Sequence, residues 1–203
     1  VDSLNDDKPY DRMIVEMLAA DEVAPTDAKA LAATGFIGRN WYKFDRNVWM
    51  FDLVEHTGQA FLGLTLKCAR CHDHKFDPVS QEEYYRFRAF FEPHDVRTDR
   101  LFAATETEKD ATLGLVLKDG VARVYDKQPD VKTFLFQRGD NRYPDESKSL
   151  SPGVPSALRG ELTPIAAVSL PVEAYYPSLR PELADGLIQQ AQLGVAKVEK
   201  EIE

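Results

Sequence analysis

The five residues Cys68-Ala69-Arg70-Cys71-His72 constrain this chain more than any other feature, because they contain its only two thiols. Two cysteines separated by two residues and followed by a histidine have the spacing that attaches a c-type haem covalently. Each thiol can form a thioether to one vinyl group of the porphyrin, and His72 can bind the iron as its proximal ligand. The motif therefore predicts one covalent haem c, held on a short turn.

Two thiols limit the other metal or redox sites that one chain can form. A four-cysteine zinc site or a cysteine-ligated iron–sulfur cluster cannot be built from one copy of the chain, because each needs about four thiolates or a close mixture with histidine. A redox-active CxxC disulfide, a mixed His/Cys metal site and a chance pentapeptide remain as alternatives. A thioredoxin-like dithiol is expected near a βαβ pattern, and none surrounds Cys68.

Charge and hydropathy exclude two broad classes of partner. The chain has 203 residues and a formal charge of -9, with no basic run that could neutralise phosphates, so nucleic acid is not an expected ligand. No apolar run approaches the roughly 18 residues that a membrane helix needs. The first ten residues lack the basic and apolar regions of a signal peptide, so any export signal is expected outside the chain. Both ends read as interrupted helices, which predicts a piece of a longer polypeptide.

The apolar periodicity predicts a mainly α fold with a small β-hairpin or sheet region and a C-terminal helix. We expect a helical, c-type haem-binding region over 1–100, a small β-rich region with a Pro/Gly-rich loop over 101–160, and an extended segment with an amphipathic helix over 161–203. Helices are predicted at 10–20 after Pro9, at 27–34 between a Thr26 cap and Gly35, and at 45–64 before the motif. Gly58 and Gly63 weaken the last of these; they would allow close backbone approach to a planar ligand, or Gly58 would mark a break.

Downstream of the motif, Ser80 and Glu83 predict a capping box and a helix that ends before Pro93. We interpret the aromatic stripe of this helix as core rather than as the wall of a haem pocket; its members are Tyr84, Phe87, Phe90 and Phe91. Residues 112–125 predict a β-hairpin that turns at Asp119-Gly120, and 131–137 predict a third strand.

Beyond Pro181 an apolar stripe predicts an amphipathic helix. Its members are Leu187, Ala191, Val195, Val198 and Ile202. Because no surface of the chain is an obvious partner for it, we expect this helix to pack on a missing downstream segment or on another subunit.

The remaining histidines are candidates for the second axial position of the iron. His56 and His94 are the candidate distal ligands, because His74 is too close to His72 to reach the opposite face of the same iron. His74 would instead hydrogen-bond a haem propionate or hold the loop at 73–77. Asp73 and Asp77 could bind calcium beside it, although carboxylates that cap the following turn and helix are the preferred interpretation.

Several long strings in the first 160 residues resemble one family. These are LNDDKPYDRMIVEMLAAD at the start, ATGF at 33–36, the string GQAFLGLTLKCARCHDHKFDPVSQEEYYRFRAFFEP around the motif, and RGDNRYPDESKSLSPGVPSAL. They are similar to the large secreted planctomycete family known as domain of unknown function 1549, described as cytochrome-c-like. The resemblance implies an exported multidomain protein, often with a further cytochrome domain upstream and a second domain of unknown function downstream. It also implies haem binding by Cys68, Cys71 and His72, with His74 and Asp77 as motif members of unassigned role.

The functional expectation is a c-type cytochrome domain that transfers electrons in an exported or periplasmic protein. Its partner would be a redox protein or a neighbouring haem domain. A haem-dependent oxidoreductase linked to sugar or polysaccharide breakdown is the alternative, and it would require an acid–base residue such as His56, His94 or Glu55. The third possibility is a non-haem structural or carbohydrate-binding module whose CxxC forms a disulfide.

Overall fold

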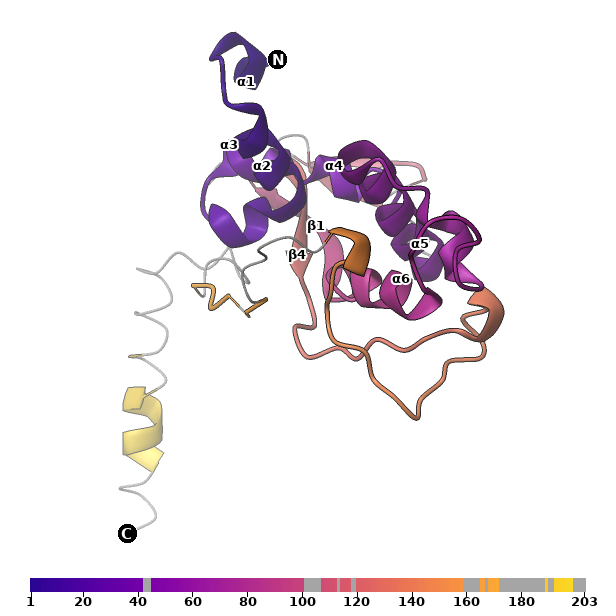
Figure 1. Cartoon of the computed structure of the whole chain (residues 1–203). Coiled ribbons are helices and arrows are strands. Elements are labelled where there is room, and N and C mark those ends of the chain that lie inside the picture. The colour runs from indigo at the N-terminus through magenta and orange to yellow at the C-terminus, as the bar shows by residue number, and fades with distance from the viewer. Residues whose placement is uncertain are drawn as a thin grey trace.

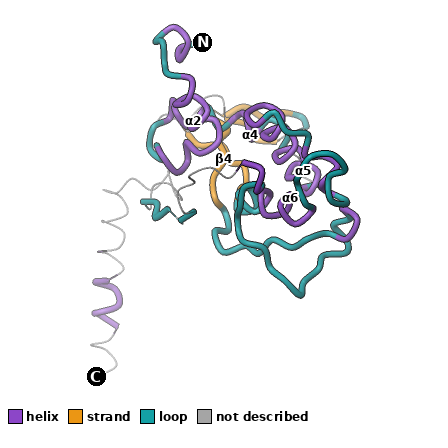
Figure 2. The backbone as a smooth tube through the Cα atoms, in the orientation of Figure 1, coloured by secondary structure: helices purple, strands orange, loops and turns teal. Residues whose placement is uncertain are grey.

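The computed structural model describes residues 1–41, 45–100, 107–112, 114–117, 120–158, 165–166, 168–171, 189 and 192–198. Over these residues the chain is mainly helical with two small antiparallel strand pairs, which confirms the predicted fold class (Figure 1). The α-helices are α1 (Asp2–Asn5), α2 (Tyr10–Val23), α3 (Ala28–Ala32), α4 (Gly35–Gly38), α5 (Arg46–Thr57) and α6 (Gln81–Arg88). Figure 2 shows how loops connect these helices around the central strands.

The first helices follow the sequence with two corrections, both at the second predicted helix. Helix α2 begins after Pro9, as predicted, and bends at Ala19, where φ is -148°. The cap of the next helix is Asp27 rather than Thr26, because the Asp27 carboxylate accepts hydrogen bonds from the backbone N–H groups of Lys29 and Ala30. Gly35 does not end that helix; it begins α4.

The helix that leads into the motif has an unusual second half. Helix α5 continues directly into a π-helical turn, η1 (Gly58–Leu62), which ends at Gly63 with a left-handed φ of 65°. Gly58 is buried here, and a Cβ atom at this position would lie 2.7 Å from Cδ1 of Leu66. The close approach at Gly58 is therefore to a core leucine, whereas the sequence suggested a planar ligand.

Helix α6 is the clearest success of the sequence analysis. The Ser80 hydroxyl accepts from the Glu83 backbone N–H, and the Glu83 carboxylate accepts from the Ser80 backbone N–H, which is the predicted capping box. Tyr84, Phe87 and Phe91 are buried in the main core with Trp49 of α5, so the aromatic stripe is core, as interpreted from the sequence. The helix is shorter than predicted and ends at Arg88, followed by a turn.

The sequence correctly predicted antiparallel strands, but it predicted the wrong pairing. Strand β1 (His94–Arg100) pairs antiparallel with β4 (Gly120–Asp126), and β2 (Thr107–Asp110) pairs antiparallel with β3 (Gly114–Leu117). The predicted hairpin joined β3 to β4 and missed β1, whose only aliphatic residue is Val96. The β2–β3 turn is fixed instead by Asp110, whose carboxylate accepts from the Thr112 backbone N–H.

Residues 133–158 wrap the helical core without a regular strand. The predicted strand at 131–137 is replaced by two isolated bridges, Thr133 with Leu150 and Phe136 with Pro144. A strand cannot extend past Pro144, because proline has no N–H to donate to a ladder. Strand β1 lies in the predicted region 1–100 and pairs with β4 in region 101–160, so the two regions share a sheet.

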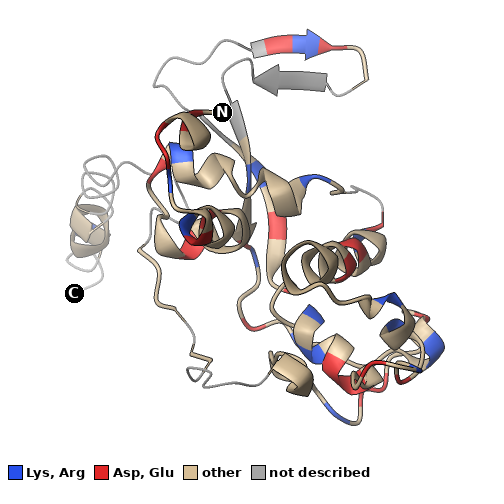
Figure 3. Ribbon diagram, turned by 45° about the horizontal axis from the view of Figure 1, so that its top comes forward, with Lys and Arg blue, Asp and Glu red and all other residues tan. Residues whose placement is uncertain are grey.

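No helix among the described residues is long and apolar enough to cross a membrane. The predicted C-terminal helix is described at 192–198, where every residue is exposed. Most of its apolar stripe, including Leu187, Ala191 and Ile202, lies outside the described residues, and its packing partner stays a prediction. Basic and acidic residues are interspersed over the helices rather than separated into large single-sign faces (Figure 3).

Candidate functional site

The motif lies on a short 3-10 helix, η2 (Leu66–Arg70), that is fixed from beneath. Leu66 and Ala69 are buried in the main hydrophobic core, with exposed fractions of 1% and 0%. Between and beside these two anchors, Cys68 is exposed and Cys71 is half-buried. The core thus holds the backbone of the turn while it leaves the Cys68 side chain in solvent.

Polar contacts from α6 fasten the same turn. The carbonyl oxygen of Arg70 accepts hydrogen bonds from Gln81 Nε2 at 3.0 Å and from the Tyr85 hydroxyl at 3.1 Å. Gln81 Nε2 also donates to the carbonyl oxygen of Phe136 at 3.0 Å. One amide group therefore joins the motif to α6 and to the wrapping segment, which were far apart in the sequence and not associated by any pattern.

The second thiol lies against the wrapping segment. Gly139 has a φ of 76°, and a Cβ atom built on it would lie 2.6 Å from the Sγ atom of Cys71. Only glycine fits both this backbone conformation and this approach. The sequence marked residues around Gly139 as a loop, but nothing in it indicated that this loop covers Cys71.

The His72 ring is held through one of its two nitrogens. The ring is exposed, and Nδ1 lies 2.7 Å from the carbonyl oxygen of Asp73. Because a carbonyl oxygen only accepts, Nδ1 is the protonated nitrogen in this contact, which leaves Nε2 as the metal-binding nitrogen. A metal-bound histidine commonly donates its other N–H to such a group, which fixes the ring and its tautomer.

His74 has a different role. Its side chain is 7% exposed, and its Nδ1 accepts from the backbone N–H groups of Phe76 and Asp77. These bonds hold the loop at 73–77, one of the two tasks predicted for it. Asp73 accepts from the Gln81 backbone N–H at 2.8 Å and so fixes the approach to α6, which is the capping arrangement preferred over a calcium site.

Glu55 and His56 lie on α5, near the motif in sequence order but in different surroundings. The Glu55 carboxylate is 3.5 Å from the Arg70 guanidinium, and burial raises the pKa of Glu55 despite this cation. His56 lines a small pocket together with Phe36, Arg39 and other residues of α4 and α5. Neither Cys68 nor His72 lines that pocket.

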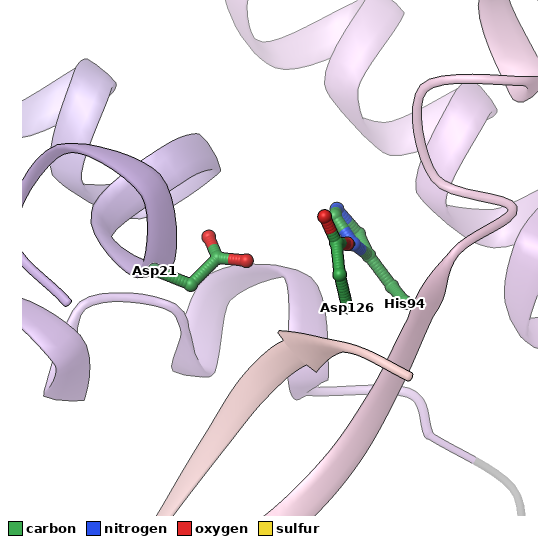
Figure 4. A group of neighbouring side chains, drawn as sticks. All are labelled: Asp21, His94 and Asp126. Atoms are coloured by element: carbon green, nitrogen blue, oxygen red, sulfur yellow. The ribbon is translucent and has the colours of Figure 1, made fainter. Parts of the chain in front are cut away.

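His94 lies at the start of β1, buried and bonded. Its Nδ1 is 2.7 Å from an oxygen of Asp126 on β4, and the Asp21 carboxylate of α2 faces the same place (Figure 4). Its ring also packs against Phe91. The contacts of the motif come from α5, α6 and the wrapping segment, so the structure does not bring His94 and the CxxCH turn together.

The N-terminal part of the chain matches a family model. Residues 1–96 match the model of the family PSCyt2, described as a protein of unknown function (DUF1549). These residues, which include the whole CxxCH motif, are similar to that family, as the sequence strings indicated. The match ends inside β1, so the predicted resemblance from there to about residue 160 is not covered by it. No curated protein and no solved structure matches the chain.

Proposed function

We propose that the CxxCH turn attaches one haem c through Cys68 and Cys71, with His72 as the proximal iron ligand, and that this domain transfers electrons. The observation that carries the proposal is the His72 ring, exposed and fixed through Nδ1 with Nε2 available, one residue after the second of two free thiols. The family name, PSCyt2, points the same way.

The residues of the turn fit a covalently attached haem. Cys68 is exposed, Cys71 is half-buried and both are free thiols, so thioether formation needs no disulfide to be reduced. When bound, the haem would supply one-electron chemistry, and axial ligation and burial would set its potential. The protein would hold it on a turn whose backbone is fixed to α6 by Gln81 and Tyr85.

Exposure favours electron transfer over catalysis. A haem attached beside two solvent-facing side chains, Cys68 and His72, would present an edge to a partner without a deep substrate cavity. The partner would be a redox protein or a neighbouring haem domain in an exported compartment, where c-type haem is attached. Of the two candidate distal ligands, His56 is favoured, because His94 is committed to Asp126 and Asp21.

The test is a pyridine haemochrome spectrum with an intact mass, on the full chain produced in a host that attaches c-type haem. The proposal predicts a c-type α-band and a mass gain of one haem in the parent. Cys68→Ser/Cys71→Ser should lose both signals, whereas Thr65→Ala, a change at an exposed residue just before the same turn, should keep them. An unmodified mass with no Soret band in folded parent protein would overturn the proposal and favour a disulfide or metal role for the thiols.

The ferric spectrum of the same preparation separates the two haem functions. Electron transfer predicts a low-spin iron with both axial positions filled, and His56→Gln should convert it to high spin if His56 is the sixth ligand. A high-spin parent would instead support the haem-dependent oxidoreductase, with an open position for a small molecule.

A further inference from the structure

A second cluster of ligand-type side chains lies away from the motif. Asp21, His94 and Asp126 come from α2, β1 and β4, and each offers one ligand atom such that all three atoms lie within 4.8 Å of one another. Figure 4 shows the Asp21 carboxylate directed toward the paired His94 and Asp126 side chains. His94 and Asp126 are also register partners in the β1–β4 pair, so the sheet itself fixes two of the three.

Asp21 makes this cluster more than a group of acidic residues. Its exposed fraction is 1%, and neither carboxylate oxygen has a hydrogen-bond partner. A buried carboxylate without a partner is unfavourable by several kcal/mol, about the scale of the desolvation of one ion. Nearly all buried polar groups in folded proteins are satisfied, so two unpartnered oxygens beside an imidazole and a second carboxylate are positioned to bind a cation.

The charges around the cluster support the same reading. Glu22 is half-buried next to Asp21 on α2, and the Asp126 side chain lies close to Asp21 from β4. Arg123 and His94 oppose this field, and Arg123 also donates to the carbonyl oxygen of Pro25. Three carboxylates thus share a buried region with one arginine and one histidine.

We propose that Asp21, His94 and Asp126 form a binding site for a divalent transition metal ion, of which zinc is the best match. Zinc accepts imidazole nitrogen and carboxylate oxygen as ligands, and three protein ligands leave one position for water. Calcium fits poorly, because it takes about six to eight oxygen ligands and this cluster has an imidazole and only two aspartates. Tetrahedral zinc with bonds of about 2.1 Å needs ligand atoms about 3.4 Å apart. Zinc binding would therefore shorten the longest separation, which is within 4.8 Å, and would lengthen the 2.7 Å contact of His94 Nδ1 with Asp126 if both atoms bind the metal.

The site would join the N-terminal helices to the sheet. The Asp126 side chain is 16% exposed, so it provides the route by which an ion can enter an otherwise buried cluster. A metal here would link α2 to both strands of the β1–β4 pair and stabilise their contact by binding only the folded chain.

The test measures binding of zinc alone to the full chain carrying Cys68→Ser and Cys71→Ser, so that the motif thiols cannot contribute. Equilibrium dialysis with metal analysis should give one zinc per chain, and zinc should raise the melting temperature. Cobalt in place of zinc should give d–d bands without a thiolate charge-transfer band. In this background Asp21→Asn should weaken zinc binding by at least about 10-fold. Glu22→Gln, the neighbouring carboxylate on the same helix, should change it by less than threefold.

Three outcomes would overturn the proposal: no zinc bound by the folded thiol-free chain, binding that Asp21→Asn leaves intact, or equal losses in Asp21→Asn and Glu22→Gln. The last would mean diffuse attraction by negative charge. If Asp21→Asn fails to fold, the stoichiometry and the cobalt spectrum of the thiol-free parent still decide the question.

Discussion

The CxxCH turn and the Asp21–His94–Asp126 cluster place histidines in opposite situations. His72 is exposed and its Nδ1 contacts the neighbouring backbone, whereas His94 is buried beside two carboxylates from other elements. The turn keeps its chemistry outside and its anchors, Leu66 and Ala69, inside. The cluster keeps its chemistry inside. The proposed haem ligands therefore lie on side chains that contribute little to stability, whereas the side chains of the cluster are part of the folded interior.

The largest expected difference is between the losses of stability caused by removing the side chains of His94 and His72. His94→Ala should lower the free energy of unfolding by about 3 kcal/mol, because it leaves the buried Asp21 and the half-buried Asp126 without their cationic or hydrogen-bonding partner. His72→Ala should change it by less than about 0.5 kcal/mol, as is usual for an exposed residue. Urea denaturation of the haem-free, chelator-treated variants measures both. Equal effects at the two positions would break the comparison.

A smaller change in stability is expected from the Gly58–Leu66 contact, which lies beneath the CxxCH turn. Gly58→Ala should destabilise the chain by about 1–2 kcal/mol, because its Cβ would lie 2.7 Å from Leu66 Cδ1 in a tightly packed core. In a Leu66→Ala background the same change should be neutral or stabilising, since alanine is the better helix former by about 1 kcal/mol. A double-mutant cycle by urea denaturation measures the coupling.

The matched control is Gly35→Ala, where an added Cβ would meet nothing within 4 Å. It should show no coupling to Leu66→Ala. Additive effects of Gly58→Ala and Leu66→Ala would mean that the π-helical turn is not held against the core by this contact.

The smallest predicted effect is pH-dependent and concerns α6, which fastens the turn. Burial opposes ionisation of Glu83, but hydrogen bonds from Ser156 and Ser80 outweigh it and lower the pKa of Glu83 to about 2. Because this pKa lies below the ordinary value of 4.5, the stabilisation is full above pH 4.5 and is lost as the pH falls toward 2. Glu83→Gln should cost about 1 kcal/mol at pH 7, a typical value for a helix cap.

The gap between parent and Glu83→Gln should narrow as the pH falls from 5 to about 2, measured by thermal unfolding over that range. Glu82→Gln is the control, because its carboxylate contacts only the exposed Lys148 among the described residues. A gap that stays constant with pH would show that the Glu83 charge has no part in the cap.

Local patterns predicted what depends on neighbours in sequence. The start of α2 after Pro9, the capping box at Ser80 and the buried aromatic face of α6 follow from spacing alone. The pairing of β1 with β4 does not, because β1 is almost wholly polar and the Asp119-Gly120 signal favoured a closer partner.

The candidate sites also contain some features that local sequence predicts and others that depend on tertiary contacts. The motif could be read directly, as could the task of His74 in its loop. The covering of Cys71 by Gly139 and the meeting of Asp21 with His94 and Asp126 depend on tertiary contacts between segments with no shared pattern. His94 was singled out as a metal ligand from the sequence, but for the iron of a haem rather than for a site with two aspartates.

The most direct test of the two-site account is to measure iron and zinc together in folded protein from one haem-competent host. The account predicts one covalent haem iron and one zinc per parent chain. Cys68→Ser/Cys71→Ser should lose only the iron, and Asp21→Asn should lose only the zinc. Iron that persists without the thiols, or a parent with neither metal after exposure to both, would contradict it.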